Sequence, residues 1–298
     1  MNTHQPEAIA IIDSMENNMY HKLRYIPSKI NSMSVTKIGE TLIVDSALPS
    51  DTFNTAYGGH ITLEQTKLVM EYYLNRKMPM AWWICSSSDD NKNTKDDMES
   101  AGFVHDEFDV GMYCDLSSAD LDEYTAPEDL QIIECRSAQE FLDFGNVLSS
   151  IFDPTDEYVK IFYSKIQAIP QDAREDLILF VGYANNQPVA TSGLFITDVA
   201  GIYDVSTKPN EQRKGYGSAM FHTALAYAKN KGLKTSILQA SPDGLNIYKR
   251  FGYKEICDFN TWSNKAKLEL QEEKSFSKLA DERIATTKKW VSHEDAWK

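Results

Sequence analysis

Apolar positions recur with two different spacings in the C-terminal half of the chain, and this pattern predicts a mixed α and β structure. Continuous or alternating apolar runs predict strands at 130–133, 177–184, 188–196, 199–207, 235–240 and 253–259. Helical spacing predicts helices at 137–151, 216–231 and 242–251. Ser137 followed three residues later by Glu140 is typical of a capping box at a helix start.

The N-terminal half has a weaker pattern of the same kind. Short apolar runs predict strands at 35–38, 42–44, 80–85 and 110–116, and helical spacing predicts a helix at 63–76. The polar stretch 89–99 indicates a loop and a short helix. Trp82 and Trp83 are adjacent in a strand, so we expect one in the core and one toward the surface, with a place in a substrate pocket as the alternative.

Two short segments are similar to each other across the halves. Ala101-Gly102-Phe103 resembles Phe251-Gly252-Tyr253, the glycines lie 150 residues apart, and each segment follows a strand and a short helical stretch. This spacing indicates a duplicated unit. Acidic residues and Pro127 interrupt the pattern near 117–128, so we expect domains at 1–124 and 125–262. The charged tail at 263–298 is expected to be a docking helix.

Composition excludes several classes of protein. The chain has 298 residues, 30 basic against 44 acidic, and a net charge of −14, which argues against nucleic-acid or anionic-membrane partners. No run approaches the ~20 apolar residues of a membrane-spanning helix. The apolar run at 8–12 is too short for a signal core. Without a C-x-x-C pair, the four cysteines are expected to be reduced core thiols in a cytoplasmic protein, and the histidines show no metal spacing, so no metal is expected.

One loop reverses the acidic balance of the chain. Between a predicted strand and a predicted helix, residues 208–217 hold Gly215, Gly217 and the adjacent cations Arg213 and Lys214. From 208 to 214 the loop has three cations against Glu211. Glycines that free backbone N–H groups, a helix N-terminus and local positive charge together suit a phosphate group. The dinucleotide and P-loop fingerprints do not fit, and a solvated turn with incidental charge is the alternative.

Two motifs in order resemble the GNAT acetyltransferase superfamily. They are Gln212-x-x-Gly215-x-Gly217 after one strand and Tyr248-Lys249-Arg250-Phe251-Gly252-Tyr253 after another. The order of elements from about 130 to 259 is also similar to that of the family. The resemblance implies a GNAT fold with a mixed, largely antiparallel central sheet flanked by helices. It further implies two tandem GNAT-like halves, of which the N-terminal copy is degenerate.

The same resemblance implies an acetyl-CoA site. Its loop would hold the pyrophosphate through Gln212, Arg213, Lys214, Gly215, Tyr216 and Gly217, with Ser218 opening the helix. The preceding strand would pair with the pantetheine arm through Val205 and Thr207. The family often has Asn seven residues before the motif tyrosine, but Ser241 stands at that position, so a cofactor contact there is less secure.

The resemblance also implies catalytic roles. Tyr248 would protonate the departing CoA thiolate, and the backbone N–H of Val205 would polarise the thioester carbonyl. Members with a carboxylate base often place it where this chain has Gly201. We therefore expect Tyr203, or Asp204, to act as the base through water. Period two puts Tyr203 on the face of Gly201 and Asp204 on the other face, unless a bulge resets the register.

These observations predict an N-acetyltransferase that moves an acetyl group from acetyl-CoA to a primary amine of a small molecule, by direct attack in a ternary complex. The alternatives are a non-catalytic acyl-CoA-binding regulatory module, which the missing carboxylate at Gly201 favours, and a nucleotide-binding domain. The N-terminal half lacks the Gln-x-x-Gly-x-Gly loop, with Gly58-Gly59 as its nearest feature. We expect that half to bind no CoA and to form one wall of the acceptor pocket. The protein is expected to be a monomer or a homodimer.

Overall fold

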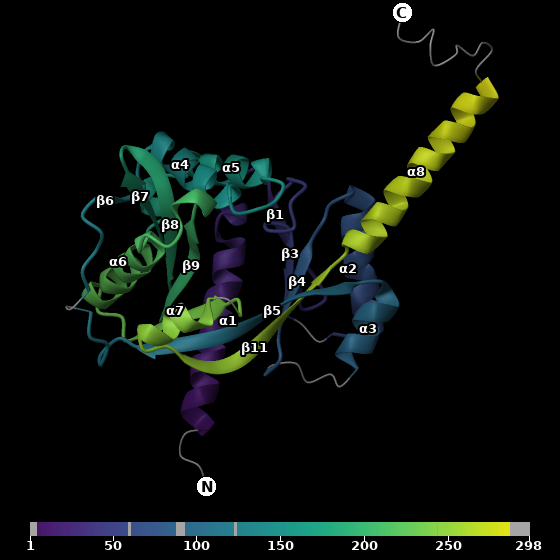
Figure 1. The fold of residues 1–298 in the computed structure, drawn as a ribbon. Helices are drawn as coiled ribbons and strands as arrows, with labels where there is room; N and C mark the ends of the chain where they lie inside the picture. Colours follow the sequence, from purple (N-terminus) through teal and green to yellow (C-terminus); the bar gives the residue numbers. More distant parts are fainter. Residues whose placement is uncertain (1–4, 59–60, 88–92, 122–123, 243, 287–298) are drawn as a thin grey trace, which may run out of the picture.

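The fold is built on a single mixed sheet. The computed structural model describes residues 5–58, 61–87, 93–121, 124–242 and 244–286. Eleven strands follow the order β1-β2-β3-β4-β11-β5-β10-β9-β8-β7-β6 (Figure 1). Only β3 with β4 and β9 with β10 pair in parallel, and the other neighbours are antiparallel. The expected mixed, largely antiparallel sheet is therefore confirmed.

The N-terminal part supplies the first five strands. Its elements in chain order are α1 (Gln5–Tyr25), β1 (Ser34–Ile38), β2 (Thr41–Asp45), β3 (Thr55–Tyr57), α2 (Leu63–Arg76), β4 (Ala81–Cys85), α3 (Thr94–Ala101) and β5 (Val104–Asp115). The strands and helix expected from periodicity are present. The helix α1 and the three-residue strand β3 were not predicted, and β5 begins six residues before its apolar run does.

The C-terminal part follows the predicted order closely. Its elements are β6 (Leu130–Glu134), α4 (Ala138–Ser149), α5 (Glu157–Ser164), β7 (Leu177–Ala184), β8 (Gln187–Ile196), β9 (Ala200–Thr207), α6 (Tyr216–Asn230), β10 (Thr235–Ala240), α7 (Leu245–Arg250), β11 (Lys254–Ser263) and α8 (Lys265–Thr286). The predicted capping box of α4 forms, because Ser137 accepts from the Glu140 N–H and Glu140 accepts from the Ser137 N–H. Only α5 was not predicted.

The two parts share the middle of the sheet. Strand β5 lies between β11 and β10, and β11 lies between β4 and β5, so each part's last strand sits beside the other part. The two strands pair antiparallel from Lys254–Tyr113 to Ser263–Val104. The sheet therefore runs without a break across the expected boundary at 124, and that division stays a prediction.

Helices cover the two faces of the sheet differently. Met15 and Met19 of α1 pack with Ile237 of β10 and Phe259 of β11, and α4 and α5 cover the same face farther along. We call this the α1 face. Phe221 of α6 packs on the opposite side, the α6 face, with Leu238, Ala240, Val110 and Met112. Odd-numbered positions of β10 therefore face α1 and even-numbered positions face α6.

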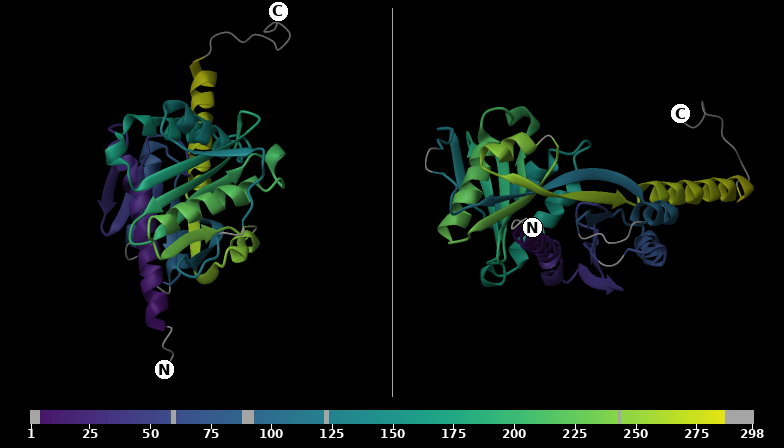
Figure 2. Two further views of the ribbon diagram at one scale, coloured as in Figure 1. Left: turned by 90° about the vertical axis from the view of Figure 1, so that its left-hand side faces the viewer. Right: turned by 90° about the horizontal axis from the view of Figure 1, so that it is seen from below.

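The C-terminal helix projects from the body of the molecule. Figure 2 shows α8 extending away from the sheet, and none of its residues is buried. The expected helix is present. Its first turn contacts the body, because Lys265 pairs with Asp51 and Asp106, and the later turns extend away from the sheet. Phe276, Leu279 and Ile284 recur at helical spacing in α8 and are exposed.

Two further expectations concern cysteines and membranes. All four cysteines are free and buried, as expected for core thiols. Of the two adjacent tryptophans, Trp82 is fully buried and Trp83 is half-buried, as predicted. Among the helices of the described residues, none has the length and apolar character to cross a bilayer.

Candidate active site

Strands β9 and β10 separate partway along their length. They pair only at Ser236–Ala200 and Ile237–Gly201, although β9 continues to Thr207 and β10 to Ala240. The separation coincides with a bulge in β9, where the β8 register shifts between Gly193–Tyr203 and Thr191–Ser206. Asp204 within the bulge has a φ of 55°. The backbone edges of two central strands are thus unpaired with each other at this end of the sheet.

The predicted phosphate loop follows β9 directly. Arg213 and Gly215 both have positive φ, 66° and 86°, which turns the chain sharply into α6. Gly215 is the N-cap residue of α6, and no side chain caps this end of the helix. The first N–H groups of a helix have no partner within the helix, and the helix dipole makes this end partly positive. The geometry therefore suits an anionic group.

Close packing explains the second glycine of the motif. A Cβ atom on Gly217 would lie 3.1 Å from the Thr207 hydroxyl oxygen, so the helix approaches the end of β9 closely there. The Gln212 side chain donates to the Thr207 carbonyl at 3.4 Å and joins the loop to the same strand end. Tyr216 is buried and its hydroxyl donates to Asp129 at 2.6 Å, so only its backbone is free for a ligand.

The charge of the loop is smaller than the sequence suggests. The Lys214 ammonium lies 2.7 Å from the Glu211 carboxylate, and the pair neutralises itself. Lys208 and Arg213 carry the remaining positive charge of the loop. Ser218 is half-buried in the first turn of α6, beside this end of the helix.

Tyr248 lies in α7 on the α6 face. Its ring packs against Phe221 at 4.9 Å and Tyr253 at 6.2 Å between ring centroids. Within the described chain its hydroxyl has no hydrogen-bond partner. Burial, and secondly the negative charge of Asp109, raises the pKa of Tyr248 to about 12, so the hydroxyl keeps its proton at neutral pH. Ser241 is exposed in the turn before α7, where its carbonyl accepts from the Gly244 N–H.

Gly201 leaves no space for a side chain. A Cβ atom there would lie 2.1 Å from Asn18 Oδ1 and 2.5 Å from the Tyr203 ring. Asn18 is fully buried, accepts from the Tyr203 hydroxyl at 2.8 Å and donates to the Phe195 carbonyl at 3.1 Å. Burial, and secondly the Asp204 charge, raises the pKa of Tyr203 well above its usual range. The Tyr203 hydroxyl is thus a committed donor and a poor base.

The bulge turns Asp204 onto the same face as Tyr203. The Asp204 carboxylate accepts from the Tyr163 hydroxyl of α5 at 2.7 Å, and the Lys22 ammonium of α1 lies 3.9 Å from it. The same ammonium lies 4.8 Å from the centre of the Tyr203 ring. Strict alternation would have separated the two side chains, so the bulged alternative is the one found. No charge partner for Asp204 was expected, because α1 was not predicted.

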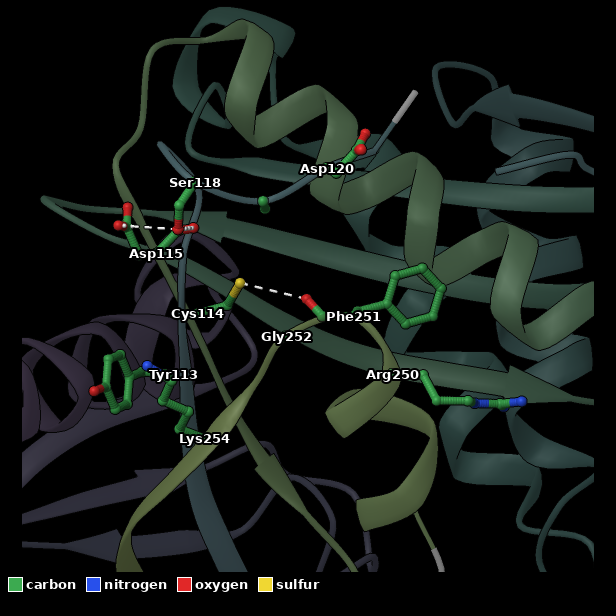
Figure 3. Close-up of a pocket in the computed structure, with 10 residues that line it drawn as sticks. Tyr113, Cys114, Asp115, Ser118, Asp120, Arg250, Phe251, Gly252 and Lys254 are labelled. Carbon is green, nitrogen blue, oxygen red and sulfur yellow. Dashed lines mark hydrogen bonds between the residues drawn. The ribbon is translucent and has the colours of Figure 1, made fainter. Parts of the chain in front are cut away.

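A separate pocket lies at the other end of β10. Its volume is about 310 Å³, and it lies where β5 ends and β11 begins (Figure 3). Cys114 points toward the Phe251 carbonyl there, with 3.5 Å between sulfur and oxygen, while Arg250 points outward. None of the predicted site residues lines this pocket. Its position, beside the Thr235–Asp115 pair, is at the end of β10 away from the separated strands.

The fold and this geometry are those of an α/β protein with a glycine-containing loop beside two diverging parallel strands. Residues 147–253 match the model of the Acetyltransferase (GNAT) family, so the chain contains a GNAT-family domain. This match supports a general acyl-CoA-dependent acetyltransfer role. Comparison with curated protein sequences gives no match.

Solved structures show the same fold at low sequence identity. A GCN5-related N-acetyltransferase from Kribbella flavida is 13% identical with a TM-score of 0.60, over 83% of this chain and 94% of that one. A functionally unknown conserved protein from Staphylococcus epidermidis is 18% identical with a TM-score of 0.57, over 79% and 98%. A tandem GNAT protein from the clavulanic acid biosynthesis pathway is 8% identical with a TM-score of 0.55, over 83% and 86%.

Four residues near the site were not found from the sequence: Asn18, Lys22, Tyr163 and Asp109. Asn18 and Lys22 belong to α1, and Tyr163 belongs to α5. The apolar spacing predicted neither of these helices. Met15 and Met19, four residues apart, were a weak signal for α1. Asp109 precedes the apolar run of β5 and therefore lay outside the predicted strand.

Proposed function

We propose that the protein transfers an acetyl group from acetyl-CoA to a primary amine of a small molecule within a ternary complex. The observation that carries the proposal is the separation of β9 from β10 directly beside the uncapped N-terminus of α6. An extended arm can pair with the exposed strand edge while its phosphates meet the helix end. The match of 147–253 to an acetyltransferase family supports this interpretation.

The residues present fit acetyl-CoA. Gly215 and Gly217 let backbone N–H groups approach the pyrophosphate, and Arg213 and Lys208 add charge. Backbone groups of Val205 and Thr207 would bind the pantetheine arm along the edge of β9. Gln212, Lys214 and Ser218 complete the loop and the first turn. Acetyl-CoA supplies an activated thioester carbonyl at this place when bound.

Two groups on opposite faces of the sheet would donate and accept the protons of the reaction. Tyr248 holds its proton at neutral pH and has no competing hydrogen-bond partner in the described chain, so it can donate to the leaving thiolate. On the α1 face, the Asp204 carboxylate can accept a proton through water, while the Tyr163 hydroxyl orients it. The Val205 N–H would polarise the carbonyl from the bulged strand.

The test is acetyl-CoA-dependent release of CoA thiol over a panel of small primary amines. The proposal expects saturable release with at least one amine, and a kcat about 10- to 100-fold lower in Tyr248→Phe at unchanged CoA affinity. Equal rates in the two proteins would remove Tyr248 from the mechanism. Failure of calorimetry to detect CoA binding would overturn the whole proposal.

One observation favours a second candidate, a non-catalytic acyl-CoA-binding module. Asn18 and Tyr203 fill the space into which a side chain at Gly201 would point. Members of the GNAT family often have a carboxylate base at this position. Such a module would bind acetyl-CoA and turn over none of the amines. Turnover by the wild-type protein separates the two candidates. In an enzyme, Asp204→Asn should then lower turnover and leave CoA binding unchanged.

A further inference from the structure

Asp109 is a half-buried carboxylate for which the described chain provides neither a hydrogen bond nor an ion pair. It lies in β5, the strand that the N-terminal part inserts beside β10. Burial, and secondly the neighbouring Glu107, raises the pKa of Asp109 to about 6. A buried carboxylate without a partner destabilises a fold and is typical of a functional site.

The strand register places Asp109 on the α1 face. Asp109 pairs directly with Phe259 of β11, which packs with α1 residues, and cross-strand partners share a face. Gly111, two residues along, also faces α1, because a Cβ atom there would lie 3.0 Å from Met15 Sδ. Tyr203 and Asp204 have their partners on this same face.

Asp109 lies level with the end of β10. Val110 pairs with Ala240, the last residue of that strand, so Asp109 is one position beyond it. Tyr248 on the α6 face experiences the Asp109 charge, and its ring contacts Gly244 in the turn after β10, where a Cβ atom would lie 3.0 Å from Tyr248 Cε2. The carboxylate and the tyrosine therefore flank one end of β10 from opposite faces, the end at which β9 and β10 separate.

Gln239 supplies a second unsatisfied group on the same face. Its Nε2 atom is fully buried and has no hydrogen-bond partner in the described chain. Gln239 pairs with Gly111 in β5, so it is the diagonal neighbour of Asp109 on the α1 face, with roughly 7–8 Å between diagonal positions. Gln239 is also two residues beyond Ile237, whose pair with Gly201 is the last between β9 and β10.

We propose that Asp109 and Gln239 form the acceptor site, which rests on the function proposed above. Asp109 holds the ammonium group of the acceptor, and the Gln239 amide donates a hydrogen bond to an oxygen of the same molecule. The substrate class is then a primary amine with an uncharged oxygen a few bonds from the nitrogen, such as an amino alcohol, amino ether or amino sugar. Lys22 does not repel this ammonium, because Asp204 pairs with it.

Two amines of equal size test this assignment. 2-Methoxyethylamine and n-butylamine have the same number of heavy atoms and differ by an oxygen in place of a methylene. At saturating acetyl-CoA, the wild-type protein is expected to show a KM about tenfold lower for the ether amine, as one buried hydrogen bond provides. A second measurement compares how far each of the two amines raises the Tm of the CoA complex.

Two variants separate the two contacts. Asp109→Asn is expected to raise KM for both amines about tenfold or more, with CoA affinity unchanged. Gln239→Met is expected to remove the preference for the ether amine and to leave n-butylamine unaffected. Asp258→Asn, an exposed carboxylate on the neighbouring strand β11, is the control and should change neither KM.

Each outcome is informative. Unchanged KM values in Asp109→Asn, or an ether preference that survives Gln239→Met, would overturn the assignment. If CoA binds but neither amine is acetylated or protects the CoA complex, the acceptor site is wrong and the CoA site stands. Absence of CoA binding in the wild-type protein would instead remove the function on which the assignment rests.

Discussion

The molecule contains two strand–helix–strand units of the same topology, one closed and one open. In the N-terminal unit, β3 and β4 pair in parallel at Thr55–Ala81, Ala56–Trp82 and Tyr57–Trp83, which is the whole length of β3. In the C-terminal unit, β9 and β10 pair at two positions and then separate. A ligand arm can insert only where a strand edge is free, so the difference favours the second unit as the proposed CoA site.

The helices of the two units differ in the same sense. Thr62 caps α2, and its side chain accepts from the Gln65 N–H, so one of the free donors at that helix start is already satisfied. Gly215 is the N-cap of α6 and provides no side-chain cap, so the backbone N–H groups of the first turn stay available. Trp82 fills the closed unit, with its ring fully buried against Phe103 at 5.7 Å between ring centroids. One unit is thus organised for packing and the other for a ligand.

The largest effect is expected from the closed unit. Trp82→Ala should lower the free energy of unfolding by about 4 kcal/mol, because it leaves a large cavity beneath β4. Chemical denaturation measures the loss. Calorimetry at low temperature should still give one CoA per chain. A change in CoA stoichiometry or affinity beyond that of the folded fraction would contradict a purely structural role for this unit.

The second effect tests the open helix end with a matched pair of glycines. Gly215→Val places a branched side chain at a φ of 86° in the loop, and CoA affinity should fall about 100-fold by calorimetry. Gly58→Val sits at a φ of 66° in the closed unit, with open space around its Cβ position. It should be strained as well but leave CoA affinity unchanged. Equal losses in both variants would erase the distinction between the units.

The third effect compares two tyrosines beside the open unit. Tyr248→Phe should lower kcat about 10- to 100-fold with little change in stability, because the described chain offers its hydroxyl no partner. Tyr253→Phe should lower stability with little change in kcat, because the buried Tyr253 hydroxyl donates to Ser236 at 2.5 Å. Its loss is expected to lower stability by about 1 kcal/mol. Steady-state kinetics and thermal unfolding of both variants give the comparison.

The smallest effect concerns pH and Asp109. Its pKa is raised from the ordinary 3.8 to about 6, so its ionisation destabilises the folded state at neutral pH and has no effect below the unfolded pKa. Asp109→Asn should therefore stabilise the protein by about 1 kcal/mol at pH 7.5, after allowance for solvent screening, and less as pH falls toward 4. A variant less stable than wild type at pH 7.5 would show that the carboxylate has a partner.

Much of the C-terminal part could be predicted from local patterns. The strand Leu177–Ala184 was predicted from a continuous apolar run, because both of its faces are buried, and the helix at Tyr216 was predicted from helical apolar spacing. The loop glycines were predicted as residues that free backbone N–H groups for an anion, and the structure adds a positive φ at Gly215 and a close approach at Gly217. The ligand roles of these residues stay predictions.

The sequence by itself determined most of the order of the elements and the position of the glycine-containing loop between β9 and α6. Only the tertiary structure decided that β5 and β11 exchange places, which brings Asp109 to the end of β10. It also decided that α1 supplies Asn18 and Lys22 to the bulge in β9. Periodicity records which face of a segment is buried. The partner that buries this face lies up to 242 residues away along the chain, beyond the reach of any local pattern.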